Sequence, residues 1–160
     1  MVEQENPNNQ YKEIVEYLTK NKESRDAALD IILSFTTTMV NRRNFIDTEV
    51  TKQLLRLTEE CIDDESVTSK TFQCLINFAL DKTWSQRLVD LNVSRRVFEF
   101  LMHNVKPTSS SIRTVNAEII KVKFTDEGSL FDVYEIKAGQ SNSIQGAVML
   151  LSNISNTEFG

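Results

Sequence analysis

The chain repeats one pattern of apolar residues at a spacing of 43 residues. Under this shift the segment ILSFTT at 32–37 falls on LINFAL at 75–80, and FIDTEV at 45–50 falls on LVDLNV at 88–93. An earlier copy, IVEYL at 14–18, lies 40 residues before its counterpart, which begins at Leu54. The apolar residues follow the period of helices with one buried face. A recurring unit of this kind predicts a chain built by stacking, because one helical pair cannot bury its apolar face alone.

Repeats of about 40–47 residues with two or three helices are typical of armadillo and HEAT proteins. We therefore predict an all-α fold of armadillo/HEAT-like repeats wound into a right-handed superhelix. The low content of glycine (4) and proline (2) favours helices with few tight turns. Residues 10–160 are expected to form this repeat domain. Residues 1–9, rich in Asn, Gln and Glu, are expected to form a disordered tail.

A third copy of the asparagine-bearing segment, LLSNIS at 150–155, comes later than the repeat predicts. Asn153 matches Asn77 at a separation of 76 residues, and the excess is close to the length of an irregular segment between the copies. We therefore expect an insertion at 105–142, inside a repeat. Within it AEIIKVKF and SLFDVYEIK change to a period of about two on either side of TDEG. This pattern indicates either a β-hairpin or a mobile loop.

Local signals predict where individual helices begin and which side they bury. Ser24 is the expected N-cap of the second helix. Four apolar residues are expected on its inner side: Ala28, Ile31, Ile32 and Phe35. The acidic residues at 63–65 suit the positive end of the next helix dipole, with cation binding as the alternative. Further short helices are expected at 86–91 and 94–104.

The chain ends at Gly160, inside what would be the next repeat, without the polar cap that closes most solenoids. We therefore expect a truncated repeat domain whose last apolar face packs against a further repeat in the full protein. The N-terminal residues lack the basic and apolar regions of a secretory signal, and no apolar run is long enough to span a bilayer. Two cysteines, Cys61 and Cys74, are expected to be reduced and buried. Together these features predict a cytoplasmic protein.

Charge and motifs argue against several classes of function. A net charge of −5 disfavours binding to nucleic acid and attachment to a membrane through a basic patch. The sequence contains no nucleophile elbow, P-loop or dinucleotide-binding fingerprint. The single histidine, His103, has no partners at the spacing that a metal site requires. We therefore predict a protein-binding protein with no enzymatic activity, cofactor, metal or small-molecule substrate.

The segments LINFALDK at 75–82 and AVMLLSNISN at 147–156 resemble the armadillo-repeat helix that carries a leucine–asparagine–leucine motif. The order of elements over 11–104 and 143–156 resembles one eukaryotic family, the armadillo-like co-chaperones that assist folding of translation elongation factor 2 (the brain protein 16 family). The insertion at 105–142 departs from that family's pattern. The resemblance implies a curved helical adaptor that brings incompletely folded elongation factor 2 to the cytosolic chaperonin. A generic armadillo or HEAT scaffold that binds extended peptides is the alternative.

The resemblance also implies a binding surface. Asn77 and Asn153 would lie on its concave side, where an amide can donate to and accept from an extended partner backbone; alternatively, each amide satisfies a local backbone group. Trp84 is either a partner anchor, because tryptophan is enriched at binding hot spots, or a residue packed between repeats. Arginines that follow the inner helices are expected either to meet acidic partner segments or to form a solvated rim: Arg42, Arg43, Arg87, Arg95 and Arg96.

Overall fold

The computed structural model describes residues 7–107, 118–122, 132–136 and 141–158. These residues form eight helices and three short strands, which confirms the all-α class for the main body of the chain. The helices are α1 (Pro7–Tyr17), α2 (Lys22–Phe35), α3 (Met39–Arg43), α4 (Val50–Glu60), α5 (Glu65–Ala79), α6 (Lys82–Asp90), α7 (Val93–Asn104) and α8 (Ser141–Glu158). The strands are β1 (Val105–Pro107), β2 (Glu118–Val122) and β3 (Asp132–Ile136).

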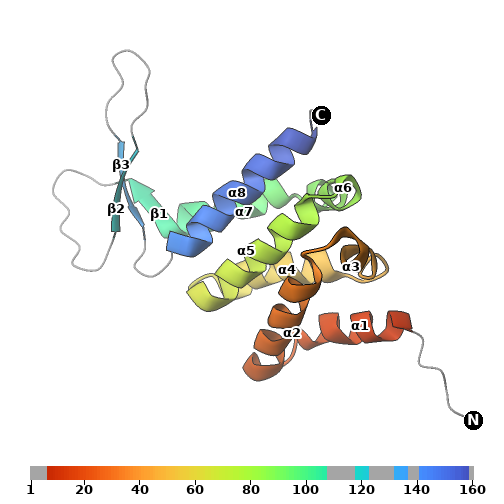
Figure 1. Cartoon of the computed structure of the whole chain (residues 1–160). Coiled ribbons are helices and arrows are strands. Elements are labelled where there is room, and N and C mark those ends of the chain that lie inside the picture. The colour runs from red at the N-terminus through yellow and green to blue at the C-terminus, as the bar shows by residue number, and fades with distance from the viewer. Residues whose placement is uncertain (1–6, 108–117, 123–131, 137–140, 159–160) are drawn as a thin grey trace, which may run out of the picture.

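Three helices that are far apart in sequence form one layer of the molecule. Figure 1 shows α2, α5 and α8 side by side in that order, and α5 contacts both of its neighbours. A second layer lies behind them, where α4 packs against α5 and α7 packs against both α8 and α4. The short helix α6 joins the layers through contacts with α5, α7 and α8. Helices α2, α5, α6 and α7 therefore each have neighbours from an earlier and a later part of the chain.

The 43-residue spacing of the sequence is also the spacing of the helices. Three helices begin at positions that this shift carries onto the first residues of three later helices: Lys22, Met39 and Val50 onto Glu65, Lys82 and Val93. A shift of 76 carries Glu65, the first residue of α5, onto Ser141, the first residue of α8. The helical elements therefore recur at the predicted spacings.

The insertion contains a small antiparallel sheet with strand order β1-β3-β2. Strand β2 pairs with β3, with Ile120 opposite Tyr134, which agrees with the predicted hairpin. The expected turn at 125–128 lies outside the described residues. Strand β1 was not predicted: it follows α7 directly and pairs with β3, placing Val105 opposite Ile136.

Several local predictions at the N-terminal end were wrong. Residues 7–9 of the expected tail belong to α1, while residues 1–6 lie outside the described part. The N-cap of α2 is Asn21, whose side chain accepts a hydrogen bond from the backbone N–H of Ser24 at 2.9 Å. On α2 the buried residues are Ala28, Leu29 and Ile32, whereas Ile31 and Phe35 are exposed. Helix α3 was missed, and α6 begins earlier than the predicted 86–91.

A row of aromatic rings crosses the core between the two layers. The ring of Phe45 lies 5.0 Å from Tyr11 and 6.0 Å from Phe78, both edge-on. Phe78 in turn lies 4.5 Å from the indole of Trp84. Such tilted and edge-to-face pairs stabilise a core beyond the area that they bury. The row connects α1, the segment after α3, α5 and α6.

Candidate functional site

The candidate site is the outer surface of the layer formed by α2, α5 and α8, called here the three-helix surface. Ser34, Asn77 and Asn153 occupy equivalent positions on these three helices. Both asparagines are half-buried, and both lie on helices that pack against each other. The two asparagines that the sequence singled out thus lie on neighbouring helices, and neither of them lines the hollow on this surface.

A hollow of about 360 Å³ opens on the three-helix surface. Its lining comes from all three helices and includes Leu33, Lys70, Gln73, Gln145, Gly146 and Met149. Amide groups, one ammonium group and apolar side chains thus surround it. This mixture suits a polypeptide, which presents backbone donors and acceptors together with apolar side chains.

Gly146 explains why α8 approaches α5 so closely beside this hollow. A Cβ atom at this position would lie 2.9 Å from Cβ of Phe72, closer than two such atoms approach. Glycine is unfavourable inside a helix by about 1 kcal/mol relative to alanine, so its place in α8 indicates a packing requirement. No sequence signal other than this isolated glycine could have revealed the close approach.

Asn77 is tied to the neighbouring helix. Its Nδ2 donates a hydrogen bond to Oγ1 of Thr36 at 3.1 Å, and Thr36 is the fully buried C-cap of α2. Its Oδ1 accepts a longer bond, 3.4 Å, from Nε2 of Gln73 on the same exposed side of α5. Asn77 thus links α5 to α2, a role that neither of the two interpretations of its amide anticipated. Within the described part of the chain, no hydrogen bond holds the side chain of Asn153.

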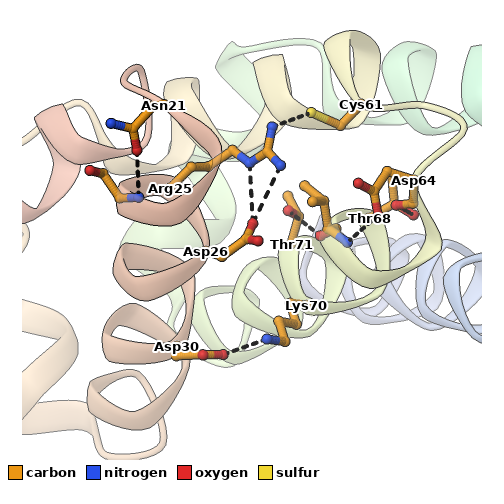
Figure 2. Close-up of polar contacts among 11 residues, drawn as sticks. Asn21, Arg25, Asp26, Asp30, Cys61, Asp64, Thr68, Lys70 and Thr71 are labelled. Atoms are coloured by element: carbon orange, nitrogen blue, oxygen red, sulfur yellow. Dashed lines mark hydrogen bonds and ion pairs between the residues drawn. The ribbon is translucent and has the colours of Figure 1, made fainter.

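Polar contacts fix the position of α5 beside α2 and the preceding turn (Figure 2). Nζ of Lys70 lies 2.7 Å from Oδ1 of Asp30, an ion pair between the two helices. The carboxylate of Asp64 accepts from the N–H of Val67 at 3.2 Å and caps α5. This agrees with the helix-start interpretation of residues 63–65. Among the residues that the structure describes, no group of His, Cys, Asp and Glu could hold a metal ion.

The N-terminus of α8 is held by an acidic residue from α5. Oε1 of Glu65 accepts from the backbone N–H of Ser143 at 3.2 Å, and Oε2 accepts from its hydroxyl at 2.5 Å. The Ser143 hydroxyl also lies 2.6 Å from Oγ1 of Thr68. The sequence suggested only that Glu65 favours the start of its own helix, because spacing along one chain does not show which later helix will lie beside it.

Trp84 does not lie on the surface. Its side chain is 1% exposed and packs on Phe78, so the prediction of a partner anchor was wrong and the packing alternative holds. Arg87 covers it from outside, with the guanidinium carbon 5.0 Å from the ring centre. Nη1 of Arg87 donates to the carbonyl oxygen of Ile46 at 2.6 Å. Both residues join α6 to the rest of the fold.

The remaining arginines differ in exposure. Arg42 is buried and bonded to Asp81 and to the carbonyl of Thr36, so it is not part of a rim. Arg96 reaches Glu59 of α4 at 3.3 Å. Arg43 and Arg95 are exposed, as a solvated rim requires.

Both cysteines are free thiols. Cys74 is fully buried between α5 and α2, and burial raises the pKa of its thiol to about 12. Burial also raises the pKa of Cys61, although the nearby Arg25, with Nη1 3.3 Å from the sulfur, opposes this shift. His103 is exposed and lies 3.0 Å from Oδ1 of Asp63.

No protein-family model matches this chain, and neither the curated proteins nor the solved structures that were searched contain a match. The resemblance to elongation factor 2 co-chaperones therefore stays a prediction. None of the helices in the described ranges is long and apolar enough to cross a membrane.

Proposed function

We propose that this chain is an armadillo-type adaptor that binds other proteins through the three-helix surface. The observation that carries this proposal is the hollow between α2, α5 and α8, where the amides of Gln73 and Gln145 stand beside apolar Met149. Met149 is 47% exposed, so it offers apolar area that a partner would bury. Binding through such a surface requires no catalytic group.

The client that we propose is incompletely folded translation elongation factor 2, delivered to the cytosolic chaperonin in the cytoplasm of a eukaryotic cell. The resemblance of LINFALDK at 75–82 and AVMLLSNISN at 147–156 to the co-chaperone family supports this choice. A partly folded client exposes both apolar side chains and backbone amide groups. Asn153 and the hollow offer partners for both kinds of group.

The test is capture of elongation factor 2 and chaperonin subunits from a eukaryotic lysate by the full chain. The variant Met149→Glu should reduce capture at least about tenfold, because a charge would have to be buried against the client. Asn153→Ala should weaken it less. Asn77→Ala is unsuitable, since this side chain also holds Thr36.

Lys52→Glu on the exposed side of α4 is the control, because it adds more negative charge than Met149→Glu but on the other layer, at the cost only of an exposed ion pair with Glu49. Equal capture by Met149→Glu and the control would exclude the three-helix surface. Failure of the unchanged chain to capture elongation factor 2 would exclude the client.

A second candidate is a general scaffold for extended peptides, and it uses the same surface. The two glutamine amides on the hollow favour it, because each can donate to and accept from a peptide backbone regardless of sequence. Titration with short unstructured peptides separates the two candidates. Binding of many unrelated peptides, with no preference for elongation factor 2, would favour the general scaffold.

A further inference from the structure

One side of the helical layers exposes apolar positions that are buried elsewhere in the molecule. We call it the distal face; it comprises Phe98 of α7 and Val148 and Leu151 of α8, whose counterparts Leu55, Phe72 and Leu75 are all fully buried. Met102 of α7 is exposed beside Phe98, but its counterpart, Glu59, is exposed as well. Phe98 is 59% exposed, whereas its counterpart 43 residues earlier, Leu55, is fully buried. Val148 is 52% exposed, whereas its counterpart 76 residues earlier, Phe72, is fully buried.

The opposite side shows the complementary difference. The proximal face comprises Ile31 and Phe35 of α2, which are 40% and 36% exposed. Their counterparts on α5 are Cys74 and Phe78, and both are fully buried. The corresponding residues of α8, Leu150 and Ile154, are buried as well.

Inside the molecule these two kinds of face already meet twice. Between α2 and α5, Cys74 from the proximal side of α5 reaches Leu29 on the distal side of α2, with its sulfur 4.0 Å from the carbonyl oxygen. Between α5 and α8, Gly146 on the proximal side of α8 rests directly on Phe72 on the distal side of α5. In both interfaces, therefore, the distal side of one helix packs against the proximal side of the next.

Charge on the distal side is limited to the edge of α7, where Arg95 and Glu99 form an exposed ion pair beside Phe98 and Met102. Between its apolar residues lie the exposed serines Ser94, Ser152 and Ser155, and no ionised side chain occupies a position equivalent to the buried positions of α4 and α5. A helix face that packs against another helix must lack unpaired charges, because burying an unpaired charge is strongly unfavourable. A face that stays in contact with solvent has no such restriction.

We propose that the distal face of one copy of this chain binds the proximal face of a second copy, continuing the α2–α5–α8 layer from molecule to molecule. The interface is heterologous, so that each copy keeps one free face and further copies can add. Tyr11 lies 6.2 Å from Phe35 and shields part of the proximal face, which leaves Ile31 as its most accessible apolar contact.

Sedimentation velocity of the full chain over a wide concentration range tests this proposal. The unchanged protein forms a ladder of assemblies as its concentration rises. Phe98→Asp blocks only the distal face and Ile31→Asp only the proximal face, and each raises the dissociation constant at least about tenfold. Both residues are exposed, so circular dichroism should show folded variants.

Mixing the two variants is the decisive step. Each variant retains one intact face, so Phe98→Asp and Ile31→Asp together form dimers of one copy each, although neither assembles alone. Lys52→Asp on α4 serves as the charge control and assembles like the unchanged chain. A monomer at every concentration would overturn the proposal. So would self-association that Phe98→Asp abolishes but Ile31→Asp leaves intact, because the distal face would then meet itself.

Discussion

Arg42 and Asp81 form an ion pair, 2.8 Å between Nε and Oδ2, that joins two successive helical units. The same guanidinium donates from Nη1 to the carbonyl oxygen of Thr36 at the end of α2. The residue 43 positions after Arg42 is Ser85, whose hydroxyl donates to the carbonyl oxygen of Ala79 at 2.8 Å. Ala79 itself corresponds to Thr36 under the same shift. Arg42 and Ser85, which occupy equivalent positions, therefore each donate a hydrogen bond to the equivalent carbonyl oxygen at the end of the preceding helix.

Removal of the Arg42 side chain should destabilise the protein markedly. Arg42→Ala leaves Asp81 and a buried carbonyl oxygen without their partner, and we expect a loss of about 2–4 kcal/mol in the free energy of unfolding. Urea denaturation followed by circular dichroism measures it. Arg43→Ala, one residue later and exposed, should change stability by no more than about 0.5 kcal/mol. Equal losses in both variants would show that the ion pair with Asp81 contributes nothing.

Gly146→Ala should destabilise the fold, against the usual helix preference. In an open helix the change stabilises by about 1 kcal/mol, but here the new methyl group meets Phe72 and we expect a loss of about 1–3 kcal/mol. Thermal unfolding compared with Gln145→Ala, an exposed neighbour in α8, gives the measurement. A gain in melting temperature for Gly146→Ala would mean that α8 lies farther from α5 than the structure has it.

Glu65 and Ser143 should show strong energetic coupling. A double-mutant cycle with Glu65→Ala, Ser143→Ala and the double variant should give a coupling energy of about 1–2 kcal/mol, since both carboxylate oxygens are bonded to Ser143. Hydrogen exchange should show lower protection of the first turn of α8 in either variant, with α1 and α2 unaffected. Additive effects of the two substitutions would contradict this contact.

The two thiols should differ in reactivity. Iodoacetamide at pH 8 should modify half-buried Cys61 first and Cys74 only on unfolding, as peptide mass spectrometry can determine. Equal rates of modification at the two sites would contradict the burial of Cys74.

The same burial predicts a dependence of stability on pH. The pKa of Cys74 is about 12 when folded and near the ordinary value of 9.0 when unfolded. Between these values the unfolded chain has lost a proton that the native state keeps, so stability falls as pH rises above about 9. The stability of the Cys74→Ala variant should fall less steeply over this range, since the variant keeps all the other titrating groups. Parallel pH profiles would exclude the effect.

The helical units could be predicted from the sequence because their signal is local. Val50 and Val93 each begin a helix after the same apolar pattern, and the residues of β2 and β3 alternate as paired strands do. The spacing of apolar residues alone is sufficient for such features. The resulting prediction of recurring helices therefore did not depend on knowing any tertiary contact.

Residue environments that depend on a distant neighbour could not be predicted. Arg42 and Trp84 are residue types common on binding surfaces, yet one is bonded to Asp81 and the other packs on Phe78. Ile31 and Phe35 belong to an apolar side of α2, but periodicity does not show that both remain exposed. Asn21 and Ser24 are equally suitable N-caps in composition, and only the backbone geometry distinguishes them.

The insertion leaves and re-enters the helical layers at neighbouring points, because Val105 pairs with Ile136. The chain passes from α4 to α5 through residues 61–64 but from α7 to α8 through residues 105–140, and α8 still packs beside α5. Loop closure depends only weakly on loop length. The α7–α8 connection is therefore a suitable place to graft a fluorescent reporter or an affinity tag, because a longer connection there should leave the packing of α8 beside α5 unchanged.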